Sequence, residues 1–108
     1  MTYFDELDCA VTVCDTTGVV IYCNKKASQT FAKYGEIMGE NLKNCHSPSS
    51  WEKICRLLQT GESNSYTIEK NGQKKIIHQT PWRENGEVRG LVEISIVLPF
   101  EMPHHVRD

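Results

Sequence analysis

The two ends of the chain alternate apolar and polar residues, whereas the middle repeats apolar residues at helical spacing. Residues 10–15 and 19–23 are short runs rich in β-branched side chains, and Thr16-Thr17-Gly18 separates them. Two such runs around a glycine-containing turn are typical of a β-hairpin. The chain is therefore predicted to begin with two antiparallel strands.

Two helices are predicted in the middle of the chain, with one or two further helical turns between them. Residues 25–34 carry apolar side chains at helical spacing after Asn24, a suitable N-cap. A longer helix is predicted over residues 51–60, with Ser49 as its N-cap and Gly61 just after its end. One apolar stripe of this helix is expected to face the core, and it consists of Trp51, Ile54, Cys55 and Leu58.

The last third of the chain is predicted to form a three-stranded meander over residues 65–70, 73–83 and 87–98. Asn71-Gly72 and Asn85-Gly86 join these runs, and Asn-Gly is the strongest short signal for a hairpin turn. The whole order of elements describes an α+β fold. We expect a five-stranded antiparallel sheet with helices inserted between strands 2 and 3.

The turn at Asn85-Gly86 fixes the pairing of the last two strands. Counted outward from this turn without interruption, the pairing places His78 opposite Glu93, within hydrogen-bond reach across the sheet. Pro81 cannot donate a hydrogen bond to a neighbouring strand and Gly90 lies opposite it, so a bulge is expected near this pair. Such a bulge would cancel the predicted pairing of His78 with Glu93.

The other face of the last strand is almost entirely apolar in this register. It carries Val88, Val92, Ile94, Ile96 and Leu98. The predicted helices cover only one side of the sheet, and the N-terminal segment offers only Tyr3, Phe4 and Leu7 as further cover. Exposed apolar area of this kind marks an interaction surface. We therefore expect a homodimer through the outer sheet face.

Length and charge favour one small domain. The chain has 108 residues and a formal net charge of -2. This size predicts a single domain over residues 1–108, with 1–9 as an N-terminal extension and 99–108 as a C-terminal tail. The charge balance argues against a nucleic-acid partner. No apolar run approaches the roughly 20 residues of a membrane span, and no secretory signal begins the chain, so we expect a cytoplasmic protein.

The order of elements resembles a PAS domain over nearly the whole chain. The residues that carry the resemblance are Asp15-Thr16-Thr17-Gly18, Ile21, Tyr22, Asn24, Ala27, Met38-Gly39 and Asn85-Gly86. More closely, Asn44-Cys45-His46, followed by Pro48, Ser50 and an amphipathic helix, is similar to the PAS-like domain of certain bacterial proteins that also carry haemerythrin-like domains.

The resemblance implies a non-enzymatic signalling module. PAS domains bind a small molecule, haem or flavin between the sheet and the helices, or bind nothing and mediate association. The first hypothesis is therefore a sensory module that binds a small molecule or cofactor and passes the signal to a partner protein. The alternative is a ligand-free dimerisation or protein-interaction module.

The candidate ligand-binding residues lie on the predicted helices and on the last two strands. They are Cys45, His46, Trp51, Cys55, His78, Trp82 and Glu93. If haem binds, His46 is the first candidate ligand of the iron and His78 the second. A flavin photosensor is disfavoured, because its reactive cysteine lies in an Asn-Cys-Arg-Phe-Leu type of motif, of which this chain has only Asn44-Cys45. The identity of any cofactor stays open.

Cysteine usage argues against a disulfide framework, because the five cysteines are odd in number and form no C-x-x-C pair. A metal site is not expected, since Cys45, His46 and Cys55 are too few convergent ligands. Catalysis by Cys45 is not expected either, because no oxyanion or substrate-binding motif accompanies it. A redox-sensing thiol at Cys45 is a further alternative.

Overall fold

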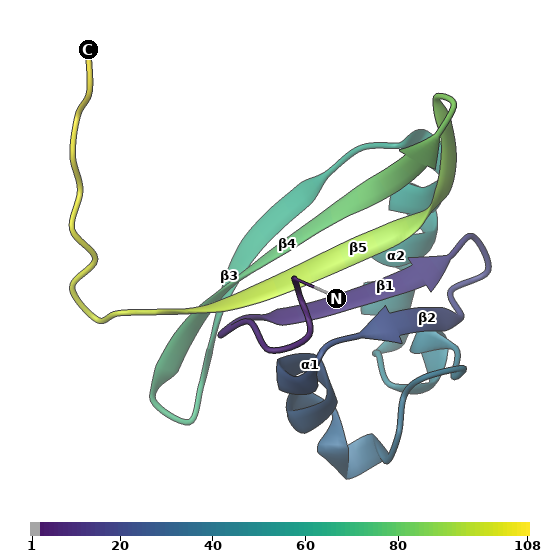
Figure 1. The fold of residues 1–108 in the computed structure, drawn as a ribbon, viewed down its shortest axis with the longest axis horizontal. Helices are drawn as coiled ribbons and strands as arrows, with labels where there is room; N and C mark the ends of the chain where they lie inside the picture. Colours follow the sequence, from purple (N-terminus) through teal and green to yellow (C-terminus); the bar gives the residue numbers. More distant parts are fainter. Residues whose placement is uncertain (1–2) are drawn as a thin grey trace.

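Hairpin turns and helix caps set the boundaries of the elements in this structure, a computed structural model that describes residues 3–108. In chain order the elements are β1 (Ala10–Asp15), β2 (Val20–Cys23), α1 (Lys25–Thr30), the 3-10 turns η1 (Ala32–Tyr34) and η2 (Leu42–Asn44), α2 (Pro48–Thr60), β3 (Asn64–Lys70), β4 (Gln73–Glu84) and β5 (Glu87–Leu98) (Figure 1). The predicted α+β fold is confirmed: helices lie between strands 2 and 3 of a five-stranded antiparallel sheet.

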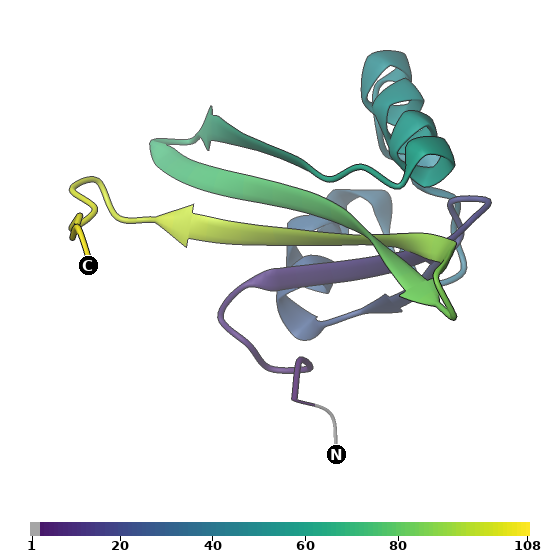
Figure 2. The same cartoon turned by 90° about the horizontal axis from the view of Figure 1, so that it is seen from above.

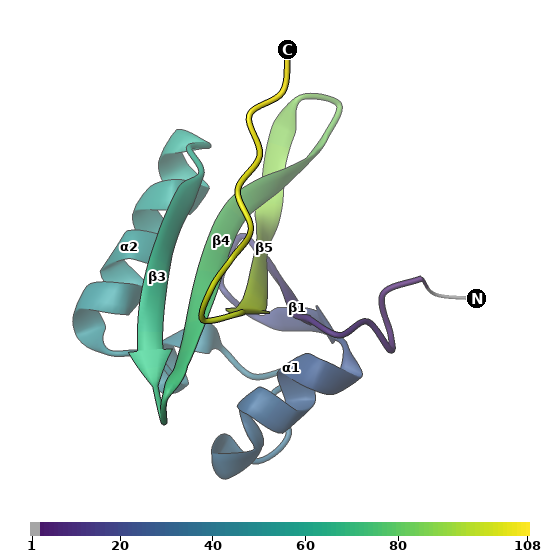
Figure 3. The ribbon, with the colours of Figure 1, turned by 90° about the vertical axis from the view of Figure 1, so that its left-hand side faces the viewer.

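The strands lie in the order β2-β1-β5-β4-β3. The first and the last strand of the chain are therefore neighbours at the centre of the sheet. Figures 2 and 3 show α2 on one side of the sheet and the N-terminal segment on the other. We call the face under α2 the inner face and the opposite one the outer face.

The core lies between α2 and one end of the inner face. Ile54 and Leu57 of α2 are 0% and 2% exposed and pack with Cys14, Val20 and Leu91 of the sheet. Trp51 and Leu58 pack at the edge of this cluster, as the predicted stripe requires. Cys55 is only half-buried, because the helix turns it away from the strands.

The cap of α2 differs from the prediction. Ser47, not Ser49, is the N-cap, and its hydroxyl oxygen accepts a hydrogen bond from the Ser50 amide at 3.2 Å. Pro48 takes the first helical position, where its missing N–H costs nothing. The helix therefore begins earlier than predicted and ends, as predicted, at Thr60, just before Gly61, whose φ of 75° is left-handed.

The first helix is shorter than predicted. Asn24 is its N-cap as expected, since its Oδ1 accepts from the Ala27 amide at 3.0 Å. The α-helix ends at Thr30, and the rest of the predicted span, as far as Tyr34, continues as the 3-10 turn η1. This short helix covers only a small part of the inner face.

Both Asn-Gly turns adopt the predicted conformation. Asn71 and Asn85 have φ values of 53° and 51°, and the glycines after them have φ values of 75° and 83°. Positive φ at both central residues is the mark of a type I′ turn, whose twist matches that of the flanking strands. The meander therefore forms as the sequence predicts.

A bulge interrupts the pairing of β4 with β5, as expected near Pro81 and Gly90. Arg83 lies opposite Val88 while Trp82 lies opposite Gly90, which leaves Arg89 as the extra residue. The bulge shifts every later pair by one position, so the predicted pairing of His78 with Glu93 is wrong.

The same bulge also moves Val88 away from the predicted outer set, because an extra residue inverts the alternation of side chains. Its Cγ2 lies 3.6 Å from where a Cβ on Gly61, at the end of α2, would be. The other four members of that set, Val92, Ile94, Ile96 and Leu98, still share one face of β5. Ile96 among them is 43% exposed.

Candidate functional site

One row of directly opposed residues crosses the whole inner face of the sheet. From β3 to β2 it consists of Asn64, Gln79, Glu93, Thr12 and Cys23. Directly opposed residues of antiparallel strands share a face, so these side chains are neighbours. We call this set the polar row. It separates the apolar core under α2 from the more open half of the inner face.

Hydrogen bonds fix the middle of the polar row. The Asn64 amide donates to Gln79 Oε1 at 3.0 Å, and Gln79 Nε2 donates to Glu93 Oε2 at 2.9 Å. Gln79 is only 3% exposed, so both ends of its amide are held inside the protein. Within residues 3–108, the other carboxylate oxygen, Glu93 Oε1, and the Thr12 hydroxyl have no protein partner.

A pocket of about 190 Å³ lies beyond the polar row, between the sheet and the end of α1. It is lined by Ala10, Thr12, Thr30, Phe31, Tyr66, Ile68, Lys70, Lys75, Ile77, Glu93 and Ser95. We call it the inner pocket. Its floor comes from β1, β5, β4 and β3, so four strands and one helix end converge on it.

The inner pocket has two chemically different ends. Glu93 and Thr12 of the polar row form one end, and Lys75 and Lys70 lie toward the other. Lys75 is four residues from Gln79 along β4, which is roughly 13 Å at 3.3 Å per residue. A carboxylate and two ammonium groups therefore face one cavity from opposite sides.

Tyr66 stands at the side of the inner pocket. Burial, followed by the negative charge of Glu93, raises the pKa of its phenol. The phenol is therefore protonated at neutral pH and offers a hydrogen-bond donor. On its other side, Tyr66 borders a second hollow of about 310 Å³ toward α2, lined by Ser49, Ser50, Lys53, Asn64, Tyr66 and Gln79.

Cys45 and His46 lie together in the loop before α2, beside the core. His46 Nδ1 is 2.8 Å from the Leu42 carbonyl and 3.4 Å from Cys45 Sγ. A carbonyl only accepts hydrogen bonds, so Nδ1 carries the proton and is not a base for the thiol. Burial, followed by the charge of Glu93, raises the pKa of Cys45. The thiol is therefore protonated and weakly reactive at neutral pH.

Two predicted site residues lie away from the inner pocket. His78 is on the outer face opposite Ile94, and its Nδ1 is 2.6 Å from Ser65 Oγ. Trp82 donates from Nε1 to the Cys14 carbonyl at 3.0 Å, and its indole lies over Gly90. A Cβ on Gly90 would lie 2.4 Å from that indole nitrogen, so the missing side chain makes room for the contact.

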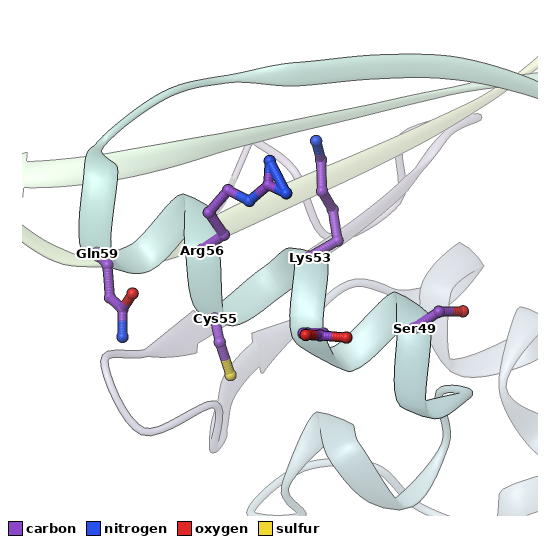
Figure 4. Close-up of a pocket in the computed structure, with 6 residues that line it drawn as sticks. Ser49, Lys53, Cys55, Arg56 and Gln59 are labelled. Carbon is purple, nitrogen blue, oxygen red and sulfur yellow. The ribbon is translucent and has the colours of Figure 1, made fainter.

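Trp51 and Cys55 lie at the far side of α2 from the inner pocket. Trp51 packs over the first hairpin turn, where a Cβ on Gly18 would lie 2.4 Å from its ring. Cys55 borders a larger, shallow hollow of about 500 Å³ whose lining comes entirely from α2 (Figure 4). In Figure 4 the long side chains of Lys53 and Arg56 fan away from Cys55 and Gln59 rather than converge on a point. This hollow is a solvated helix surface.

The structure therefore divides the predicted site. Glu93 is the one predicted residue that lines the inner pocket. Among residues 3–108, no group of three or more His, Cys, Asp or Glu side chains is placed to hold a metal ion. Sequence reasoning missed Thr12, Tyr66, Gln79 and Lys75. Placing the bulge at the Trp82 and Gly90 pair would have brought Gln79 opposite Glu93 and found the row.

Comparisons with known proteins agree on the fold. A family model described as PAS domain matches residues 8–96. The PAS domain of histidine kinase ThkA has a TM-score of 0.66 at 20% identity, covering 83% of this chain and 99% of that one. A sensory box histidine kinase from Vibrio cholerae has a TM-score of 0.69 at 14% identity, covering 90% and 87%. No curated protein sequence matches the chain.

A third similar structure is Vibrio cholerae VqmA, described as a dimer in the absence of target DNA. It has a TM-score of 0.68 at 18% identity and covers 89% of this chain, but this chain spans only 48% of VqmA. Identities this low show a shared fold. Among the described residues, no helix is both long enough and apolar enough to cross a membrane.

Proposed function

Because the chain belongs to the PAS domain family, we propose that it is a sensory module that binds a small molecule in the inner pocket and passes the signal to a partner protein. The observation that carries the proposal is the pocket itself, where an apolar wall meets a few placed polar groups of the polar row. Such a combination is typical of ligand sites. PAS sensory domains are generally non-catalytic, and we propose no catalysis.

The test is to fill the pocket. Ser95 lines it from β5, and Ser95→Phe places a ring in the cavity. Thr67→Phe is the matched control, since Thr67 is exposed and pairs with Ile76 on the outer face. Native mass spectrometry and a thermal-shift screen of small metabolites are expected to show a ligand with wild type and Thr67→Phe but not with Ser95→Phe. Equal binding by all three proteins would place the ligand elsewhere.

A ligand-free dimerisation module is the second candidate, and the exposed outer face supports it. Ile96 is 43% exposed there, and Tyr3 and Phe4 of the N-terminal segment are 80% and 55% exposed. We propose a homodimer through this face. Ile96→Lys is expected to give a monomer by analytical ultracentrifugation, while Gln59→Lys, at an exposed position of α2 on the other side of the sheet, leaves the dimer intact. A dimer that persists in Ile96→Lys would exclude this interface.

A haem or redox sensor that uses His46 or Cys45 ranks third. The hydrogen bond from His46 Nδ1 to Leu42 leaves Nε2 to ligate iron. Against haem, the inner pocket is small and His46 does not line it, and against a redox role, the pKa of Cys45 is raised. An absorption spectrum recorded after adding haem decides: a Soret band that His46→Ala removes would establish the haem sensor.

We also propose that the protein works in the cytoplasm of a bacterium and has no nucleic-acid partner. All five cysteines are free thiols, as in reducing compartments, and the net charge is -2. The similarity of Asn44-Cys45-His46 and Pro48 to the PAS-like domain of haemerythrin-associated bacterial proteins supports this proposal.

A further inference from the structure

The charged groups of the inner pocket define what it accepts, provided that the pocket is the ligand site proposed above. At one end, Glu93 gives Oε2 to Gln79 and keeps Oε1 for another donor. The Thr12 hydroxyl is beside it in the same row. An ionised carboxylate only accepts hydrogen bonds, so this end selects a group that donates them, and a protonated amine satisfies it best.

The other end selects the opposite charge. Lys75 lines the pocket from β4, and Lys70 lines it from the end of β3. Within residues 3–108, neither lysine forms an ion pair with an acidic side chain. Two unpaired ammonium groups at the mouth of a cavity favour a carboxylate or a phosphate.

The middle of the pocket is apolar. Phe31 lies over it from the end of α1, and Ile68 and Ile77 form the floor between the two charged ends. Methylene groups are the natural occupants of such a stretch, because they bury apolar surface without leaving a polar atom unpaired.

The size of the pocket limits the ligand. About 190 Å³ equals roughly six waters at liquid density, so only a molecule of about ten non-hydrogen atoms fits. The polar row and Lys75 lie roughly 13 Å apart along β4, and the two side chains shorten that gap. In an α-amino acid both charged groups are attached to the same carbon, so the molecule does not span this distance.

We propose that the inner pocket binds a small amphoteric molecule whose amine meets Glu93 and whose carboxylate or phosphate meets Lys75, with a short apolar spacer between the two. The ligand belongs to the class of ω-amino acids and their phosphate counterparts, in which the two charges lie at opposite ends. Recognition depends on both charges and on their separation.

Isothermal titration calorimetry on the full chain with four probes tests the proposal. 5-Aminopentanoate has both charges and the spacer. Pentylamine and pentanoate each lack one charge, and norvaline has both charges on one carbon. 5-Aminopentanoate is expected to bind at least about tenfold more tightly than each of the other three, the factor that about 1.4 kcal/mol provides.

Two variants assign the ends. Glu93→Gln is expected to weaken 5-aminopentanoate about tenfold and to leave pentanoate binding unchanged. Lys75→Met is expected to weaken 5-aminopentanoate similarly and to leave pentylamine unchanged. Matched controls are Glu87→Gln in the hairpin turn of β5 and Lys74→Met, the exposed residue next to Lys75. Circular dichroism establishes that each variant is folded.

Replacing the carboxylate with a phosphonate shows which anion the lysine end prefers. Tighter binding of 4-aminobutylphosphonate than of 5-aminopentanoate favours a phosphate ligand, and weaker binding favours a carboxylate. Equal binding of pentylamine, pentanoate or norvaline would overturn the inference, as would insensitivity to both pocket variants. If a neutral compound from the screen binds wild type but not Ser95→Phe while no amphoteric probe binds, the inference fails and the proposed function stands. If nothing binds, both fail.

Discussion

The two halves of the inner face share β1 and β5 but differ in almost every other respect. Under α2, Ile54 and Leu91 are 0% and 2% exposed and pack in a dry core. Beyond the polar row, Tyr66 and Ile68 are 42% and 37% exposed around a cavity. The difference follows from cover: α2 has 13 residues, whereas α1 has 6. A sheet becomes a core or a pocket according to the helix that lies on it.

The largest expected effect comes from removing apolar bulk in each half. Ile54→Ala is expected to lower the free energy of unfolding by about 3 kcal/mol, because the cavity cannot collapse. Ile68→Ala, the same substitution in the pocket half, is expected to cost less than about 1 kcal/mol, because Ile68 is already partly exposed. Urea denaturation measures both values, and equal losses would contradict the division into core and pocket.

The next largest effect is expected in the polar row, which separates the two halves. Gln79→Leu leaves the Asn64 amide and the Glu93 carboxylate without their partner, at an expected cost of about 1–2 kcal/mol. Gln73→Leu, at an exposed position of the same strand, is the control. A stabilised Gln79→Leu protein would mean that the polar row is merely tolerated rather than needed.

Thiol chemistry gives a smaller contrast. Burial raises the pKa of Cys14, in the core half, to about 11. At pH 8, iodoacetamide is therefore expected to alkylate native Cys14 at least about tenfold more slowly than half-buried Cys55 on α2. Peptide mass spectrometry over time gives both rates. Similar rates would show that the core half opens readily.

The smallest expected effect concerns the hairpin turn at the core end. Asp15 Oδ1 accepts hydrogen bonds from the Thr17 amide, the Thr17 hydroxyl and the Val19 amide. The bond from the Thr17 hydroxyl is the largest cause that lowers the pKa of Asp15 below its ordinary value of 3.8. The ionised carboxylate therefore stabilises the fold above about pH 4, and this contribution is lost as the pH falls.

Asp15 is only partly buried, so Asp15→Asn is expected to cost less than about 1 kcal/mol at pH 7 and nothing near pH 2. Thermal unfolding of both proteins between these values measures the difference. A stability difference between wild type and Asp15→Asn that increases toward low pH would contradict this explanation.

The sequence was sufficient for the fold because its strongest local signals agree with one another. Asn-Gly at both meander turns, Asn24 at the start of α1 and Gly61 at the end of α2 all behave as local chemistry predicts. Ser47 and Ser49 are chemically equal as caps, and Pro48 decides between them, since it occupies the first helical position.

The site was harder to predict from the sequence, because it depends on which residues of β4 and β5 face the same side of the sheet. A bulge was expected near Pro81 and Gly90, but its placement by one residue decides whether His78 or Gln79 faces Glu93. The pocket also depends on where α1 stops, and helix ends are set by weak local preferences. Glu93 could be identified from the sequence, whereas the residues around it become its neighbours only through the observed strand register.

The position of β5 between β1 and β4 has a consequence for how the protein folds. The hairpin of β1 and β2 has no partner in the sheet until residues 87–98 have been synthesised. The free edge of β1 therefore stays unpaired through most of the chain's synthesis. Pairings this distant in sequence slow folding, and domains dominated by them fold in milliseconds to seconds. The sheet is thus completed by its last strand, and the nascent hairpin depends on β5 for its final place in the molecule.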